Sequence, residues 1–335
     1  MILIISAEDD NHVPSVTRML EALGAEYVWF DPAHFPTQSE VCIAYDRYGL
    51  SRQLLRFRDR DLDLAAVTAV WNRRPGLPTA AARIRGTACR KWMSRESGHC
   101  LAGIWENMDC LWIPGKPRDV RDGQNKVRLL ALAATLGFRI PRTLITNSPE
   151  GLLEFYAECS GCLVTKVLGD GLIHRGGERY LAYTHVVRRR HAAGYRAVRY
   201  GPLIVQEYVP KRLELRITVV GTRVFAAEIH SQASRSTQHD WRHYDNERAT
   251  YVPHTLPTAI ETLCVRLVQA LKLSFGAIDM ILTPAGEYIF LEINPSGQFG
   301  WVEELTSLPI STAIAELLCS APPTPSKLWA DEASL

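Results

Sequence analysis

Lysine is scarce in this sequence, which has seven lysines against 31 arginines among 335 residues. The formal net charge is only +2, whereas a dedicated nucleic-acid binder normally carries a large positive excess. The charge therefore argues against nucleic acid as a partner. The arginine surplus has two open interpretations: a codon bias without functional meaning, or a supply of planar cations suited to grip carboxylate and phosphate.

Long hydrophobic runs are also missing. No apolar stretch reaches the roughly 18 residues that a membrane-spanning helix needs, so we expect no membrane segment. The first ten residues, MILIISAEDD, lack the basic start of a signal peptide and turn acidic at once. We expect them to form a buried first strand instead.

The eight cysteines do not form the pattern of a metal site. Cys159 and Cys162 make one CxxC, but a structural zinc site would need a second such pair or a spaced histidine pair. A chain this long and core-rich has no need of a disulfide scaffold. We expect free, reduced thiols and a cytoplasmic location.

What the sequence does contain is the pattern of a mixed α/β protein, with 47% hydrophobic residues and a length that suits about two domains or one multi-lobed unit. Strands and helices alternate at 2–6, 13–23, 25–30, 66–71 and 80–107, which predicts an N-terminal α/β domain with a partly parallel sheet over residues 1–115. The breakers at 113–117 mark its end.

Two further regions follow. A central one (116–209) contains predicted helices at 122–136 and 149–158 and strands at 163–168, 179–183 and 203–208. A strand-rich one (210–320) has strands at 213–220, 222–230, 275–282 and 287–293 and helices at 256–273 and 303–319. We expect the Pro-rich tail, 321–335, to be disordered.

The most informative segment is an apolar hairpin near the C-terminus. Asp279 and Glu292 are equidistant from a point inside the turn Thr283–Gly286, so they should lie opposite each other, and Asn294 shares the face of Glu292. Buried carboxylates that face each other repel unless a cation neutralises them. Oxygen ligands without His or Cys suit Mg²⁺ together with phosphate oxygens. The alternative is an exposed hairpin end with ordinary surface acids.

The usual phosphate-binding motifs, GxxxxGK[ST] and GxGxxG, are absent. Lys166 lies in an apolar strand, where a lysine is costly unless it faces an anion. Lys126 opens a predicted helix, and by itself is equally consistent with a solvated position. The strand that contains Gln206, Glu207, Tyr208 and Val209 ends in polar side chains before a proline. An extended segment there offers backbone groups to an adenine edge, although a plain core strand is an alternative.

These residues, with Glu214, Arg216, Asp279, Glu292 and Asn294, occur in the order used by ATP-grasp enzymes. The resemblance covers about residues 115–320. The segments WNRRP (71–75), EIHSQ (228–232), DWR (240–242) and LEINPSGQFGW (291–301) resemble a narrower group, the ATP-grasp macrocyclases that mature graspetides, which includes the microviridin-type peptide ligases. The resemblance implies an ATP-grasp fold with an N-terminal α/β lobe, a central lobe and a C-terminal antiparallel-sheet lobe.

The resemblance also implies a role for each matching residue. Lys126 and Lys166 contact ATP phosphates. Gln206, Glu207, Tyr208 and Val209 form the adenine hinge, where Glu207 and Val209 use backbone groups, and Glu214 holds the ribose. Arg216 and Arg242 bind the γ-phosphate or an acyl phosphate. Asp279, Glu292 and Asn294 hold two Mg²⁺ ions. The loop 169–177, GDGLIHRGG, departs from the usual Gly/Ser-rich form.

The implied reaction is carboxylate activation on a ribosomal precursor peptide with a leader and an acidic core, by a homodimeric enzyme. An Asp or Glu side chain attacks the γ-phosphate of ATP, and a Thr or Ser hydroxyl or a Lys amine then displaces phosphate. No residue in the sequence indicates a general base. Arg73, Arg74, Arg188, Arg189 and Arg190 are candidates to steer the acidic peptide, with a solvated basic surface as the alternative.

The sequence leaves two other functions open. One is a RimK-like ligase that adds free amino acids to a protein or peptide, which the Asp279, Glu292 and Asn294 site does not distinguish from a macrocyclase. The other is a non-catalytic ATP-binding module that regulates a partner. The costly acidic cluster argues against the latter, because a non-catalytic protein has little reason to retain it.

Overall fold

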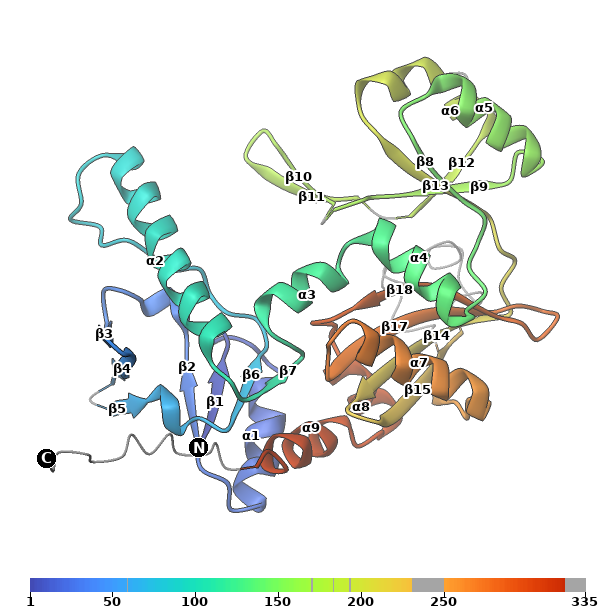
Figure 1. Cartoon of the computed structure of the whole chain (residues 1–335). Helices are drawn as coiled ribbons and strands as arrows, with labels where there is room; N and C mark the ends of the chain where they lie inside the picture. The colour runs from blue at the N-terminus through green and yellow to red at the C-terminus, as the bar shows by residue number, and fades with distance from the viewer. Residues whose placement is uncertain (59, 170, 183, 193, 231–249, 323–335) are drawn as a thin grey trace, which may run out of the picture.

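The N-terminal unit is built on a parallel sheet with the strand order β2-β1-β6-β7 (Figure 1). The computed structural model describes residues 1–58, 60–169, 171–182, 184–192, 194–230 and 250–322. In the parallel sheet and its helices, the elements are β1 (Ile2–Ile5), α1 (Val13–Ala22), β2 (Tyr27–Phe30), β6 (Ala69–Asn72), α2 (Thr87–Asn107) and β7 (Leu111–Ile113). The expectation of a partly parallel α/β unit is confirmed.

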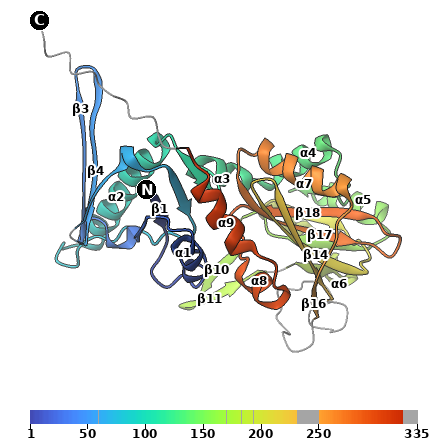
Figure 2. The ribbon, with the colours of Figure 1, turned by 90° about the horizontal axis from the view of Figure 1, so that it is seen from below.

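A second sheet in this unit is antiparallel and was not expected from the sequence. It consists of β3 (Ser39–Asp46), β4 (Gly49–Phe57) and β5 (Arg60–Asp63), flanked by the short helices η1 (Pro32–His34) and η2 (Leu64–Ala66). Strands β3 and β4 form a long hairpin that projects from the unit (Figure 2).

Two helices, rather than the single one predicted over 122–136, lead to the central lobe. They are α3 (Pro117–Gly123) and α4 (Lys126–Leu136). The chain breaks at Asn125, whose side chain accepts a hydrogen bond from the Arg128 amide at 3.1 Å and so caps α4. Gly137, with φ of 103°, ends α4 in the left-handed conformation that glycine favours.

The central lobe contains an antiparallel sheet with the order β12-β9-β13-β8. Its strands and helices are β8 (Thr143–Thr146), α5 (Pro149–Glu158), β9 (Leu163–Lys166), β12 (His185–Val187), α6 (Arg189–Ala192), η3 (Tyr195–Tyr200) and β13 (Leu203–Glu207). The loop 169–177 enters a separate hairpin of β10 (Leu172–Arg175) and β11 (Glu178–Leu181), which projects from the lobe (Figure 1).

The C-terminal unit is an antiparallel sheet with the order β16-β15-β14-β17-β18. Its elements are β14 (Leu213–Val220), β15 (Arg223–Ile229), β16 (Tyr251–Pro253), α7 (Thr258–Ala270), β17 (Phe275–Leu282), β18 (Tyr288–Asn294), α8 (Gly300–Thr306) and α9 (Ile310–Cys319). The helix predicted over 303–319 is therefore two helices. No helix in the described ranges is long and apolar enough to cross a membrane.

Strand β14 shows how this sheet separates a core from a site. Alternate side chains of a strand point to opposite faces. Leu213, Leu215 and Ile217 pack into the core beneath α4 and α7, whereas Glu214 and Arg216 are buried on the opposite face. The sheet therefore supplies both the largest core of the C-terminal unit and the floor of a polar cavity.

Candidate functional site

A cavity lies between the central lobe and the C-terminal sheet. Its walls come from β9, β13, β14, β17, β18 and the segment that follows β13. The sequence-predicted residues that line it are Lys166, Gln206, Glu207, Tyr208, Val209, Glu214, Asp279 and Glu292. The fold thus brings together side chains that are separated by as many as 126 positions in the sequence.

One end of the cavity carries the predicted acidic residues. Asp279 on β17 pairs with Glu292 on β18, and Asn294 is two residues further along β18. Arg216 lies opposite Asp279 on β14, and its Nη1 donates to Asp279 Oδ1 at 2.9 Å. The predicted pairing across the hairpin is confirmed. It depends on a β-bulge between Asp279 and Met280 that shifts the register by one residue.

The donor set fits Mg²⁺. Within the described part of the chain, no three Asp, Glu, His or Cys side chains gather into a group able to hold an ion by themselves. Asp279 and Glu292 line the cavity, and Asn294 follows two residues along β18. Two carboxylates and an amide oxygen match a cation that takes few protein carboxylates and completes its shell with water and phosphate oxygens. The Asn294 Oδ1 already accepts from the Ser296 amide at 3.1 Å, which fixes the orientation of its side chain.

The two predicted lysines lie at the same end. Lys126 is the first residue of α4, and its Nζ donates to the Val167 carbonyl at 2.6 Å and lies 3.7 Å from Glu292 Oε2. Lys166 ends β9. Both lysines line a smaller cavity together with Glu292. The fold therefore places two cations beside the acidic end, the balance of charge that a phosphate chain with Mg²⁺ would need.

The residues of the predicted hinge also line the cavity. Gln206 is 2% exposed, and its Nε2 donates to Thr143 Oγ1 at 2.9 Å. Its Oε1 has no hydrogen-bond partner among the residues that the structure describes. The Glu207 and Tyr208 amides donate to the Arg142 and Cys162 carbonyls at 2.9 and 2.8 Å, so both are already used within the fold.

Lys211 lines the cavity and was missed from the sequence. Its Nζ lies 2.7 Å from Glu214 Oε1, and the two side chains are only 4% and 7% exposed. The available signal was indirect: one of the seven lysines stands between the hinge and Glu214. Burial raises the pKa of the nearby Tyr208 phenol, and the Glu214 carboxylate adds to that effect.

The other arginines that the sequence singled out do not form one cluster. Arg73 is 4% exposed, so it does not belong to a basic surface as the sequence suggested, whereas its neighbour Arg74 is exposed. Arg188 and Arg190 are exposed on the central lobe, where Arg189 opens α6. Arg242 lies outside the described residues, as does the DWR segment that contains it.

All eight cysteines are free thiols. Burial raises the pKa of the Cys159 thiol, and the carboxylates of Glu207 and Glu158 add to that effect against the Arg142 cation. A raised pKa disfavours the reactive thiolate, so the CxxC segment lacks the electropositive surroundings of a redox pair.

Two protein-family models match the chain. Residues 1–118 match the MvdD pre-ATP grasp domain, and residues 123–318 match the RimK-like ATP-grasp domain. Among curated proteins, a probable alpha-L-glutamate ligase of Klebsiella pneumoniae is 25% identical over 191 residues, which are 56% of this chain and 61% of that protein. The chain thus spans less than two thirds of the length of this relative.

Solved structures resemble the chain over nearly its whole length. A RiPP-associated ATP-grasp ligase of Chryseobacterium gregarium, in complex with ADP and a leader and core peptide, is 31% identical with a TM-score of 0.88, covering 96% of this chain and 97% of that one. The macrocyclase MdnC of Microcystis aeruginosa, bound with its precursor peptide MdnA, is 31% identical with a TM-score of 0.82, covering 95% and 98%. The chain belongs to the ATP-grasp family, in the branch of graspetide-type peptide ligases.

Proposed function

We propose that this protein is an ATP-dependent ligase that activates Asp or Glu side chains of a ribosomal precursor peptide and joins them to Thr or Ser hydroxyls or Lys amines as macrocycles. The observation that carries this proposal is the match over 96% of the chain to a ligase whose structure holds ADP and a leader and core peptide. The cavity between the central lobe and the C-terminal sheet supports it, because hinge, cations and acids occur there in one pocket.

In this proposal, the cavity binds ATP along its length. Gln206–Val209 receive the adenine, and the Glu214 carboxylate binds the ribose while Lys211 holds that carboxylate in place. Lys126 and Lys166, which lie beside Glu292, contact the phosphates. Asp279, Glu292 and Asn294 hold Mg²⁺, which neutralises charge on the transferring phosphoryl group when bound.

Arg216 is the residue proposed to act on the reacting groups. The residue is 5% exposed and its guanidinium points at Asp279, so it lies at the phosphoryl end of the cavity in a water-poor site. The peptide carboxylate attacks the γ-phosphorus, which yields an acyl phosphate and ADP. A fixed guanidinium lowers the energy of the charge that spreads over the phosphoryl oxygens during this transfer. Arg242 is proposed to share this role.

The proposal extends to organisation and partners. Residues 1–115, 116–209 and 210–320 serve as the N-terminal, central and C-terminal domains of a cytoplasmic homodimer. The exposed Arg188 and Arg190, with Arg74, attract the acidic peptide over a distance set by salt. Reversing the charge at 188–190 is expected to raise the peptide Michaelis constant at low salt, and less so at high salt.

The test uses the full chain, ATP, Mg²⁺ and a candidate precursor, which is to be sought as a short acidic, Thr-rich reading frame beside the gene. We expect the loss of one water mass per link, with release of ADP. Asp279→Asn should reduce ADP release by at least about 10²-fold, because it removes a proposed metal ligand and the partner of Arg216. Glu287→Gln is the matched control, since it removes a carboxylate from the exposed end of the same hairpin.

Full activity of Asp279→Asn would contradict the metal assignment.

A second function is favoured by the curated relatives, which are probable alpha-L-glutamate ligases. In that case the peptide gains the mass of a glutamate residue, and only when free glutamate is supplied. The same mass spectra therefore separate ring formation from the addition of an amino acid.

A further inference from the structure

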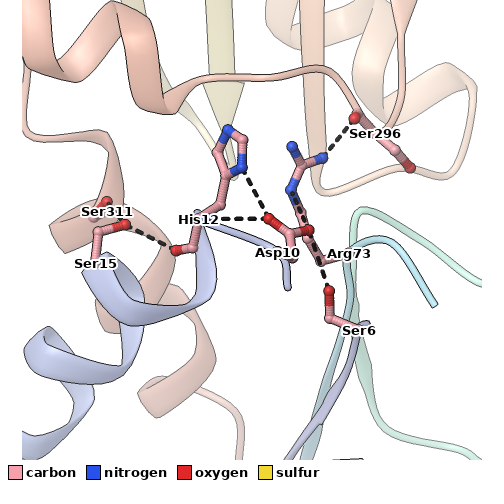
Figure 3. Close-up of polar contacts among 7 residues, drawn as sticks. All are labelled: Ser6, Asp10, His12, Ser15, Arg73, Ser296 and Ser311. Carbon is pink, nitrogen blue, oxygen red and sulfur yellow. Dashed lines mark hydrogen bonds and ion pairs between the residues drawn. The ribbon is translucent and has the colours of Figure 1, made fainter. Parts of the chain in front are cut away.

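A buried polar cluster of Asp10, His12 and Arg73 lies at the carboxyl edge of the parallel sheet (Figure 3). Asp10 follows β1 and Arg73 follows β6, and these two strands are neighbours. From β1 the chain continues to β2 on one side, and from β6 it continues to β7 on the other. The cluster therefore occupies the topological switch point, where open α/β sheets bind their ligands.

Asp10 orients the imidazole of His12. The Asp10 Oδ1 lies 2.9 Å from His12 Nδ1 and also accepts from the His12 amide at 2.9 Å. Its Oδ2 accepts from Ser6 Oγ and lies 3.6 Å from Arg73 Nε. Burial alone would raise the pKa of Asp10, but the hydrogen bonds from His12 and the Arg73 charge lower it to about 2. An ionised carboxylate on Nδ1 fixes the proton there and leaves Nε2 as the basic nitrogen.

The Nε2 side of the ring faces an open groove. His12 is 5% exposed, yet it lines a groove between α1 and α8, together with Ser15, Gln298 and Trp301. Within the described residues, no side chain or backbone group forms a hydrogen bond with Nε2. Phe299 packs edge-on against the ring at 4.9 Å, and Gly300 leaves the space for it, because a Cβ at this position would lie 3.2 Å from Nε2.

The groove adjoins the proposed phosphoryl end through one short segment. Arg73 Nη1 donates to the Ser296 carbonyl at 2.6 Å, and Arg216 Nη2 donates to the Gln298 carbonyl at 3.2 Å. The same Arg216 guanidinium binds Asp279. A single residue, Gln298, is thus both a wall of the groove and a partner of the arginine that points at the acidic site. A peptide lying in the groove would pass both His12 and Gln298, the residue whose carbonyl accepts a hydrogen bond from Arg216.

We propose that His12, positioned by Asp10, is the base that accepts the proton of the acceptor hydroxyl or amine during ring closure. This inference rests on the proposed function. The acceptor oxygen or nitrogen attacks the carbonyl carbon of the acyl phosphate, its proton passes to His12 Nε2, and the bond from carbonyl carbon to phosphate oxygen breaks. The products are an ester or amide and inorganic phosphate, and no other co-reactant is needed.

The experiment separates activation from ring closure. Hydroxylamine traps an acyl phosphate as a hydroxamate and needs no acceptor side chain of the peptide. With hydroxylamine present, we expect His12→Gln to release ADP and form hydroxamate within about threefold of wild type. Without hydroxylamine, ring closure should be slower by on the order of 10²-fold, the usual contribution of a general base. Asp10→Asn should reduce ring closure by a smaller factor. His34→Gln, a change at a half-exposed histidine of the same unit, should leave both steps unchanged.

Hydroxamate formation also serves as the control for folding, because it needs an intact ATP cavity. If His12→Gln impairs folding, His12→Ala with added imidazole replaces it, and imidazole should restore ring closure. Ring closure by His12→Gln at the wild-type rate would overturn the inference, as would an equal loss of hydroxamate and rings in a folded variant. Absence of hydroxamate with the wild-type protein would instead contradict the proposed function itself.

Discussion

At the scale of single residues, a lysine and a glutamate are buried side by side in the cavity. Lys211 and Glu214 lie 2.7 Å apart with almost no exposure. Removing both charges from water is expensive, and their attraction recovers that cost only in good geometry. Such a pair contributes little to stability by itself, so its position in the cavity indicates a role in holding the Glu214 carboxylate for a ligand.

The effects of substituting Lys211 and Glu214 on the free energy of unfolding should not be additive. Lys211→Met removes the cation beside a buried carboxylate and should lower the free energy of unfolding by about 3–5 kcal/mol. The double variant Lys211→Met with Glu214→Gln should recover most of this loss in urea denaturation, but not the affinity for ATP. Arg128→Met, which breaks the exposed pair with Asp122, should cost less than about 1 kcal/mol. A double variant as unstable as the single one would contradict this.

The sequence identifies site residues that are unusual for the segment in which they occur. Lys166 and Asp279 were identifiable because charged side chains stand inside apolar strands, and both line the cavity. Lys211 and His12 carry no such signal. Their roles depend on neighbouring side chains and cavity walls that only the fold brings together. The doublet of Arg73 and Arg74 looks uniform in the sequence, although one guanidinium is buried and the other is exposed.

At the scale of elements, the β17–β18 hairpin shows what the sequence pattern predicts and what it does not. Beside the turn, Leu282 pairs with Tyr288, and a regular ladder from there would place Asp279 opposite Leu291. The bulge advances β18 by one residue, so that Glu292 faces Asp279. The predicted pairing is right, but its cause, an extra residue in one strand, leaves no mark in a period-two pattern.

Other elements were missed for similar physical reasons. Strands β3 and β4 bury few side chains, Leu55 and Phe57 among them, so they lack the apolar run that reveals a strand. The break between α3 and α4 depends on the Asn125 cap, which competes with a continuous helix that the composition also permits.

The segment after Asn294 predicts the effect of a single methyl group. A Cβ at Gly297 would lie 2.3 Å from Ala277 Cβ and 2.8 Å from Arg216 Nη2. Gly297→Ala should therefore displace the segment, cost about 1–3 kcal/mol in stability, and slow ADP release by on the order of 10²-fold through the shift of Arg216. The control is Gly201→Ala, at an extended position with no atom within 4 Å. Wild-type ADP release by Gly297→Ala would show that Arg216 tolerates the shift.

At the scale of the whole molecule, the N-terminal unit and the C-terminal sheet share one hydrophobic core. Ile4 and Trp71 from the parallel sheet belong to the same buried cluster as Phe275 from β17 and Ile314 from α9. Helix α9 packs against α1 (Figure 2). Ser311 Oγ donates to Ser15 Oγ between the two helices (Figure 3). The central lobe has a smaller core of its own around Leu152 and Phe155. This division predicts two cooperative units rather than three.

Hydrogen exchange tests that division with two matched truncations. Ile314→Ala leaves a cavity in the shared core and should cost about 2–5 kcal/mol. Because the core is shared, exchange should accelerate in β1 and β15 together, while β9 and β13 keep their rates. Leu152→Ala should do the reverse, since its contacts lie within the central lobe. Faster exchange in β15 without any change in β1 would mean that the two units open separately. The groove beside His12 would then open and close with the motion between them, because its walls come from α1 on one unit and α8 on the other.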